Sequence, residues 1–163
     1  MKRGILLLLC FVSFTGISQA HLNFEKNNSL GSDVTMRGVG GSFQYYFRTG
    51  KKNLPGISFG AIREQDITRN QTFLSVPVNL HLRHYFLGSH DCFAGVYIEG
   101  SAGANFQMQG ILDSDFSNTT LIQGAGGIGV QLLRKVDVNL RVGRNFSPDL
   151  QYNYVGLRAG IRL

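Results

Sequence analysis

Apolar and polar residues alternate along most of this chain with a period of two. In the segment 136–142, valine or leucine occupies every second position and polar residues lie between them. Alternation of this kind places the two rows on opposite faces of a β-strand. The same register occurs over 72–86 and 152–163, and no segment after residue 20 has apolar residues at helical spacing over several turns.

This alternation predicts eight β-strands. The first has the fewest apolar positions, because only Leu22 and Phe24 form its apolar row. After residue 20 the chain has 143 residues. Eight strands leave about 18 residues for each strand and its connection, whereas fourteen or sixteen strands would be too short to cross a bilayer. Ten strands remain an alternative. The predicted strands span 21–26, 34–48, 55–65, 72–86, 92–107, 119–133, 136–147 and 152–163.

The predicted connections alternate between short and long. Short turns follow the second, fourth and sixth strands, whereas longer or more polar loops follow the first, third and fifth. Outer-membrane barrels have this arrangement, with short turns in the periplasm and longer loops outside the cell. The short turns cover 49–54, 87–91 and 134–135, and the longer loops cover 27–33, 66–71 and 108–118.

Strands with one apolar row fit two architectures. In a soluble barrel or sandwich the apolar row fills the core, whereas in a membrane barrel it faces lipid and the polar row fills the lumen. The polar row here consists of Gly, Ser, Asn, Gln, Tyr and Arg, with Lys absent from the strand interiors, which favours a crowded lumen. Strands of about 10 to 15 residues also suit a tilted bilayer crossing. We therefore expect an all-β, eight-stranded antiparallel transmembrane β-barrel with up-and-down connections.

Aromatic residues gather near the ends of the predicted strands, although the chain has no Trp. Aromatic side chains form belts at both membrane interfaces of outer-membrane barrels. The predicted aromatic girdle comprises Tyr45, Phe47, Tyr85, Phe86 and Phe93 on the periplasmic side, and Phe73, Phe106, Phe146 and Tyr152 on the outer side.

The first 20 residues have the features of a secretory signal peptide. A basic start is followed by an apolar run from Ile5 to Val12 and by a small-residue cleavage site at Ala20. The apolar run is too short to span a bilayer. We expect residues 1–20 to be removed on export and residues 21–163 to form one barrel domain in the outer membrane.

The remaining chain is only mildly basic, with 14 Lys and Arg against 10 Asp and Glu. This charge is spread along the chain, whereas nucleic-acid binding needs a clustered basic surface, so we expect no nucleic-acid partner. Cys92 is the only cysteine after residue 20, which excludes an internal disulfide and a cysteine metal site in the exported domain. We expect no cofactor and no bound metal.

Five segments share a pattern of apolar and small residues with a known group of barrels. They are FLSVPVNLHLRHYF, FAGVYIEGSAGANF, the Gly-rich LIQGAGGIGVQLL, VDVNLRVGRNF and YNYVGLRAGIRL. The most distinctive order is Val76-Pro77-Val78 in the first of them. Over residues 34–163 the chain resembles the PorT-like outer-membrane β-barrel domain family, and by size it is similar to the OmpA-barrel and OmpX class. The resemblance implies a small outer-membrane barrel.

Two motifs that could carry chemistry have simpler structural explanations. Gly124, Gly126 and Gly129 match a dinucleotide-binding spacing, but that motif needs a following helix, and a strand is predicted here. Small residues relieve crowding in a barrel strand instead. His81 and His84 fall on opposite faces of one strand, and the predicted outer loops contain no His, which leaves no acid–base partner there. We expect no catalytic residues and no enzyme activity.

Ionisable residues on the polar row form the strongest candidate site. A buried carboxylate is costly unless it is paired, so we expect Glu99 to pair with Arg141 or Arg158. One interpretation is a salt-bridged plug, and the other is a gate that opens a narrow channel. An eight-stranded barrel is just wide enough for its own side chains, which excludes a wide pore. The expected lumen charge network comprises Arg83, Glu99, Asp137, Arg141, Arg158 and Arg162.

These features predict an integral outer-membrane barrel with both termini in the periplasm and a structural, surface-interaction or assembly-associated role. The expected partners are outer-membrane lipid, periplasmic chaperones and the barrel-assembly machinery during biogenesis, and a protein at the outer loops, especially 108–118 with Asp113 and Asp115. A narrow gated channel for small solutes is the alternative. An exported soluble barrel of lipocalin type, with its apolar rows inside, is a third hypothesis.

Overall fold

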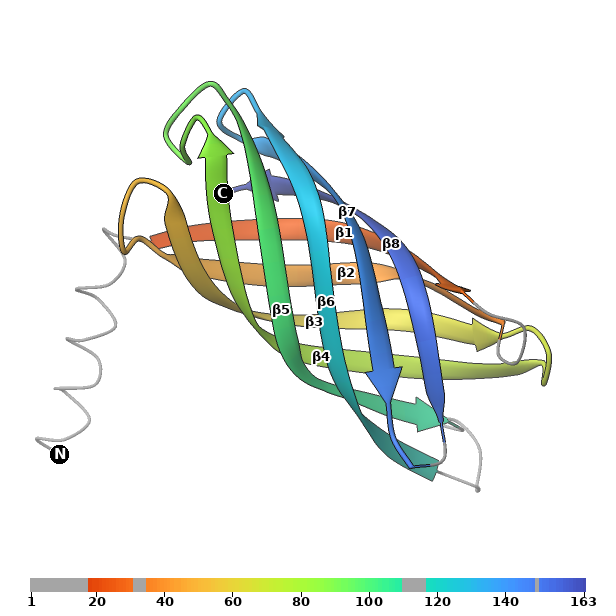
Figure 1. The fold of residues 1–163 in the computed structure, drawn as a ribbon. Coiled ribbons are helices and arrows are strands. Elements are labelled where there is room, and N and C mark those ends of the chain that lie inside the picture. Colours follow the sequence, from red (N-terminus) through yellow and green to blue (C-terminus); the bar gives the residue numbers. More distant parts are fainter. Residues whose placement is uncertain (1–17, 31–34, 110–116, 149) are drawn as a thin grey trace, which may run out of the picture.

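The computed structural model describes residues 18–30, 35–109, 117–148 and 150–163, which form a closed antiparallel β-barrel of eight strands. Each strand pairs with the next along the chain, and the last pairs with the first. Figure 1 shows the strands tilted as they wind around the barrel. The predicted eight-stranded fold is confirmed. The strands are β1 (Ser18–Leu30), β2 (Met36–Phe47), β3 (Asn53–Asp66), β4 (Gln71–Leu87), β5 (Ala94–Gln109), β6 (Ser117–Leu132), β7 (Val136–Phe146) and β8 (Gln151–Arg162).

Apolar side chains cover the outside of the barrel, and polar side chains fill its inside. Leu80 and Ile122 on the outward rows are 69% and 67% exposed. On the inward rows, Arg83 and Arg158 are fully buried. An apolar outside around a polar lumen is typical of a membrane barrel and is the inverse of a soluble one. Among the described residues, no helix is long and apolar enough to cross a membrane.

The connections at the two ends of the barrel are of similar length, which differs from the prediction. The end that holds the start of β1 and the end of β8 is here called the terminal end, and the opposite end is called the far end. The predicted alternation of short turns and long loops is not observed, because β1, β5 and β6 extend further toward the far end than expected. The terminal end has connections 48–52, 88–93 and 133–135, and the far end has connections 31–35, 67–70, 110–116 and 147–150.

Strand β1 is longer than predicted at both ends. It begins at Ser18, inside the predicted signal peptide, and Gln19 and Ala20 pair with β2. The backbone N–H of Leu163 donates a hydrogen bond of 2.9 Å to the carbonyl of Ala20. The predicted strand was too short because polar residues follow its brief apolar row. Cleavage after Ala20 stays a prediction, and residues 1–17 lie outside the described part of the chain.

The predicted aromatic girdle is wrong for three of its nine members, which lie on inward rows. Tyr85 and Tyr152 lie on the inward rows of β4 and β8, where they are 0% and 7% exposed. They alternate in step with Arg83 and Arg158, so their parity excludes them from the lipid-facing side. Phe73 also lies on the inward row and packs against the buried cluster that contains Tyr152. The other predicted members, Tyr45, Phe47, Phe86, Phe93, Phe106 and Phe146, lie on the outward rows or in an exposed turn.

Pro77 lies at a gap in the ladder between β3 and β4. The paired residues Phe59 and Val78 precede the gap, and pairing resumes in the same register at Ile62 and Ser75. Proline has no backbone N–H to donate. It therefore occupies a position without a ladder hydrogen bond, as its place in a predicted strand requires.

Gly129 of β6 allows an aromatic ring to lie against the barrel wall. It pairs with Tyr97 of β5, and a Cβ added to Gly129 would lie only 2.3 Å from Cζ of that tyrosine. The strand β7 follows β6, so the helix that a dinucleotide motif needs is not there. The glycine makes room for an inward tyrosine.

Candidate functional site in the barrel lumen

Glu99 of β5 is the centre of the charge network in the lumen. Its Oε2 accepts hydrogen bonds from Nε of Arg83 at 2.9 Å and from the hydroxyl of Tyr46 at 2.5 Å. Its Oε1 lies 3.2 Å from Nδ1 of His81 and accepts a hydrogen bond from Arg158. The partners belong to β2, β4 and β8. One buried carboxylate thus connects several walls of the barrel through charge-assisted hydrogen bonds.

Asp137 of β7 forms the second half of the same network. Its Oδ2 lies 2.8 Å from Nδ1 of His21, and its Oδ1 accepts a hydrogen bond of 2.9 Å from the hydroxyl of Tyr97. Nη2 of Arg83 lies 3.4 Å from Oδ1. Arg83 therefore joins Asp137 to Glu99, and the network extends from β1 to β8.

Arg83 is also stacked between tyrosine rings. Its Cζ lies 3.9 Å from the ring centre of Tyr97 and 4.6 Å from that of Tyr46. A guanidinium over an aromatic face gains a cation–π interaction, which is strongest where water is excluded. Both tyrosines belong to a fully buried cluster with Leu54 and Tyr85. Each member of this cluster lies close to the terminal end of its strand.

A separate charge pair lies on the other side of the network. Nη1 of Arg141 is 3.5 Å from Oε2 of Glu25, and Nη2 of Arg141 donates a hydrogen bond of 3.2 Å to Ser101. Glu25 also accepts a hydrogen bond from Ser42. Of the two expected partners of Glu99, Arg158 contacts it and Arg141 pairs with Glu25 instead.

Glu64 is a buried carboxylate of a different kind, near the far end. It accepts hydrogen bonds from Gln107 at 2.5 Å, from Tyr152 at 3.3 Å and from Ser75. Within the described part of the chain, no Lys, Arg or His forms an ion pair with Glu64. It is a buried acid held by neutral donors alone.

The structure brings four of the six predicted lumen residues into one network, namely Arg83, Glu99, Asp137 and Arg158. Arg141 lies in the separate pair, and Arg162 lies at the terminal end, where it donates a hydrogen bond of 3.1 Å to the carbonyl of His90. The network also includes His21, Tyr46, His81 and Tyr97, which the predicted set did not contain. Each lies on the inward row of its strand, and the alternation of residues already indicates a lumen position for His81 and Tyr97.

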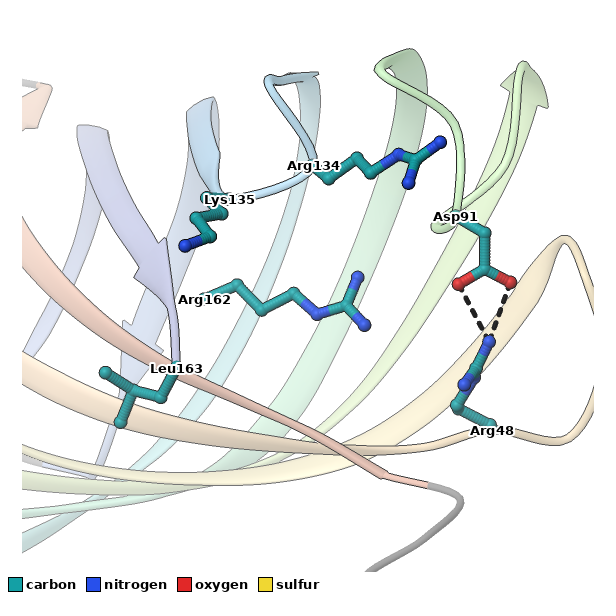
Figure 2. A pocket seen from close by; sticks show the side chains of 6 residues that line it. All are labelled: Arg48, Asp91, Arg134, Lys135, Arg162 and Leu163. Carbon is teal, nitrogen blue, oxygen red and sulfur yellow. Dashed lines mark hydrogen bonds and ion pairs between the residues drawn. The ribbon is translucent and has the colours of Figure 1, made fainter.

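A basic vestibule of about 610 Å³ opens at the terminal end. Nη2 of Arg48 contacts both carboxylate oxygens of Asp91, at 2.8 and 2.6 Å, and Figure 2 shows Arg134 and Arg162 extending toward this pair. The fully buried cluster of Tyr46, Leu54, Tyr85 and Tyr97 lies near the same end of the barrel. Its lining residues are Arg48, Asp91, Arg134, Lys135, Arg162 and Leu163.

Ser58, His81 and Glu99 form a hydroxyl–imidazole–carboxylate chain. Oγ of Ser58 lies 2.6 Å from Nε2 of His81, whose Nδ1 faces Glu99. Serine hydrolases use these groups in the same order. Here Ser58 is 4% exposed, so its hydroxyl is buried inside the barrel. The serine holds the histidine in the lumen network.

The histidines do not converge on a metal site. His81 faces the lumen, whereas His84 lies on the outward row, where Nδ1 is 2.6 Å from Oδ1 of Asn53. His90 lies in the connection between β4 and β5. The described residues contain no group of three or more His, Cys, Asp or Glu that could hold a metal ion.

Comparison with known proteins identifies the fold but not a family. No family model and no curated protein matches the chain, so the resemblance to the PorT-like family is not confirmed. Ail of Yersinia pestis, solved in complex with the heparin analogue sucrose octasulfate, is 12% identical over 90% of this chain and 97% of that chain, with a TM-score of 0.59. Neisserial surface protein A is 14% identical over 90% of this chain and 94% of that chain, with a TM-score of 0.57. The N-terminal barrel domain of Pseudomonas aeruginosa OprF is 10% identical over 89% of this chain and 97% of that chain, also with a TM-score of 0.57. The chain has the fold of these small outer-membrane barrels.

Proposed function

We propose that this protein is an integral outer-membrane barrel with a closed lumen, and that its role is structural or depends on surface interactions. The observation that carries this proposal is the set of ion pairs buried across the lumen. Salt bridges join three buried arginines to three buried carboxylates. Arg83 pairs with Glu99 and Asp137, Arg158 pairs with Glu99, and Arg141 pairs with Glu25.

A gated channel is disfavoured because opening the lumen would break the buried contacts of Arg83. Arg83 would have to leave Glu99, Asp137 and the tyrosine rings that enclose it. Separating a buried charge from its partner costs about 3 to 5 kcal/mol. A conducting state therefore lies well above the closed state in free energy.

Single-channel recording in planar bilayers tests the closed lumen. Wild-type protein and the variant Glu99→Ala are expected to show no stepwise conductance, because Arg83 and Arg158 remain in the lumen, while the variant loses stability. A large porin reconstituted in the same way controls for insertion. Stepwise currents from wild-type protein would contradict the closed lumen, and currents from the variant alone would favour a gate.

We also propose that the terminal end faces the periplasm and that the far-end connections carry the surface role. The names of two similar structures, attachment invasion locus protein and surface protein, support a surface role for this fold. Asp113 and Asp115, which we expected to contact a partner, lie outside the described residues, and their role stays a prediction.

The native Cys92 offers a direct test of orientation, because it is exposed in the connection between β4 and β5 at the terminal end. A membrane-impermeant maleimide added to intact cells is expected to leave Cys92 unlabelled. It is expected to label Thr68→Cys, at the far end, in a Cys92→Ser background. Labelling of Cys92 with protection of the Thr68→Cys variant would reverse the orientation, and detergent-free solubility of the folded protein would refute the membrane location.

A further inference from the structure

The charged residues of the strands are sorted between the two faces of the barrel. Every carboxylate in a strand points into the lumen and is buried, as for Glu25, Glu64, Asp66, Glu99 and Asp137. The outward rows carry no carboxylate at all within the described strands. They do carry cations, which are Lys26, Arg37, Arg63 and Arg144, and each is exposed. Lys26 also corrects the expectation that Lys is absent from strand interiors.

Three of these cations lie together on β1, β2 and β3. Val39 is the residue between them, because it pairs with Lys26 on one side and with Arg63 on the other. Arg37 lies two residues from Val39 on the same face of β2. Directly paired residues in adjacent strands lie about 5 Å apart at Cα, so the three side chains extend from one small patch. We call Lys26, Arg37 and Arg63 the basic patch.

The basic patch lies where the apolar outer surface ends. On β1 the outward row is apolar up to Phe24, and Lys26 and Asn28 follow toward the far end. On β3 the outward row is apolar up to Ala61, and Arg63 and Gln65 follow. With the membrane location proposed above, this change from apolar to polar puts the basic patch at the level of the lipid headgroups. Lipid-facing cations are tolerated there and not at the centre of the bilayer.

Among the described residues, the basic patch has no anionic partner. In the described ranges, no ion pair includes Lys26, Arg37 or Arg63, and the outward rows around them are free of Asp and Glu. Arginine guanidinium groups bind phosphate through paired hydrogen bonds, and a lysine ammonium adds a point charge. Two arginines and a lysine at headgroup level form a surface that is complementary to clustered phosphates.

We propose that the basic patch is a binding site for a phosphorylated lipid of the leaflet at the far end, with Arg37 and Arg63 binding phosphate oxygens. The acyl chains of that lipid would lie along the apolar outer surface below the patch, which includes Phe24, Phe43 and Phe59. Arg144 on β7 lies outside the patch and donates a hydrogen bond of 2.7 Å to Gln151. The site rests on the membrane location proposed above.

Lipid competition in nanodiscs tests this site. Folded protein is placed in phosphatidylcholine discs containing either a disaccharide lipid with two phosphates or the same lipid without phosphate. Native mass spectrometry then measures the lipid that stays bound. Wild-type protein is expected to prefer the phosphorylated lipid by about tenfold or more, since each interfacial cation adds a favourable term toward an anionic headgroup.

Two triple variants with the same loss of charge decide where binding occurs. Lys26→Gln/Arg37→Gln/Arg63→Gln is expected to abolish the preference. Lys51→Gln/Arg134→Gln/Lys135→Gln, which removes three exposed cations at the terminal end, is expected to keep it. Folding of each variant is checked by heat-dependent gel mobility.

Three results would overturn the lipid site. They are an equal affinity of wild-type protein for both lipids, an unchanged preference in the basic-patch variant, and an equal loss in both triple variants, which would indicate non-specific charge attraction. Failure of wild-type protein to insert into either disc would instead refute the membrane location. The two proposals can therefore fail separately.

Discussion

Replacing Glu99 with glutamine tests whether the lumen charges stabilise the barrel as an ion-paired unit. Glutamine keeps the size of the side chain and one acceptor oxygen but removes the negative charge. Arg83 would keep its ion pair with Asp137, in which Nη2 of Arg83 lies 3.4 Å from Oδ1 of Asp137. Arg158 would keep no counter-ion, because Glu99 is its only salt-bridge partner in the described part of the chain. A fully buried cation left without its partner costs about 3 to 5 kcal/mol.

We therefore expect Glu99→Gln to lower the free energy of unfolding by about 3 kcal/mol or more. Glu64→Gln is the matched control, since neutral donors hold that buried acid and its replacement leaves no cation without a counter-ion. Its expected loss is at most about 1.5 kcal/mol. The double variant Glu99→Gln/Arg158→Gln should lose less than the sum of the two single variants, with a coupling of about 2 kcal/mol.

Urea unfolding in phosphatidylcholine vesicles, followed by circular dichroism and by gel mobility, measures these values. A loss below about 1 kcal/mol for Glu99→Gln would refute the reasoning, because that is the range of an ordinary hydrogen bond. Equal losses for Glu99→Gln and Glu64→Gln would also refute it, since burial and not ion pairing would then set the cost.

Three further predictions concern other parts of the barrel. Gly129→Ala is expected to destabilise by about 1 to 3 kcal/mol, because the added Cβ would lie 2.3 Å from Tyr97, whereas Gly126→Ala, whose nearest neighbouring atom would be 4.0 Å away, should leave urea unfolding unchanged. Since the chain has no Trp, Leu80→Trp adds a single tryptophan on the outward row, which can be excited apart from the tyrosines. Its emission should be quenched by lipids brominated in the acyl chain, and absence of quenching would contradict lipid contact. A fluorophosphonate probe should leave the buried Ser58 unmodified in the folded barrel, and labelling that is lost in Ser58→Ala would show that its hydroxyl is accessible.

Most of the fold follows from the alternation of residues, because period two determines both the strand and the face on which each side chain lies. The alternation fails for β1, where few apolar residues mark the outward row, so His21 and Glu25 were not assigned to the lumen. Tyr85 and Tyr152 lie near strand ends, which predicts an aromatic girdle, but they share the inward face with Arg83 and Arg158.

The pairing within the lumen could not be predicted from the sequence. Arg141 and Arg158 both lie on inward rows, and which of them contacts Glu99 depends on the tilt and relative shift of strands that are distant along the chain. Barrel closure sets that shift. The basic patch has the same origin, since Lys26, Arg37 and Arg63 become neighbours only through the register of β1, β2 and β3.

The placement of the lumen charges has a consequence for how the barrel assembles. Glu99 on the fifth strand meets Arg158 on the eighth, and Asp137 on the seventh meets His21 on the first. A partly inserted sheet of six strands would hold Glu99 and Arg83 in place while the last hairpin, with Asp137 and Arg158, is still missing. Both an open strand edge and an unpaired charge have a high free-energy cost in the hydrocarbon core of a membrane. Joining β8 to β1 and completing these ion pairs therefore depend on the same last hairpin, and a barrel halted before it arrives has both an open strand edge and unpaired lumen charges.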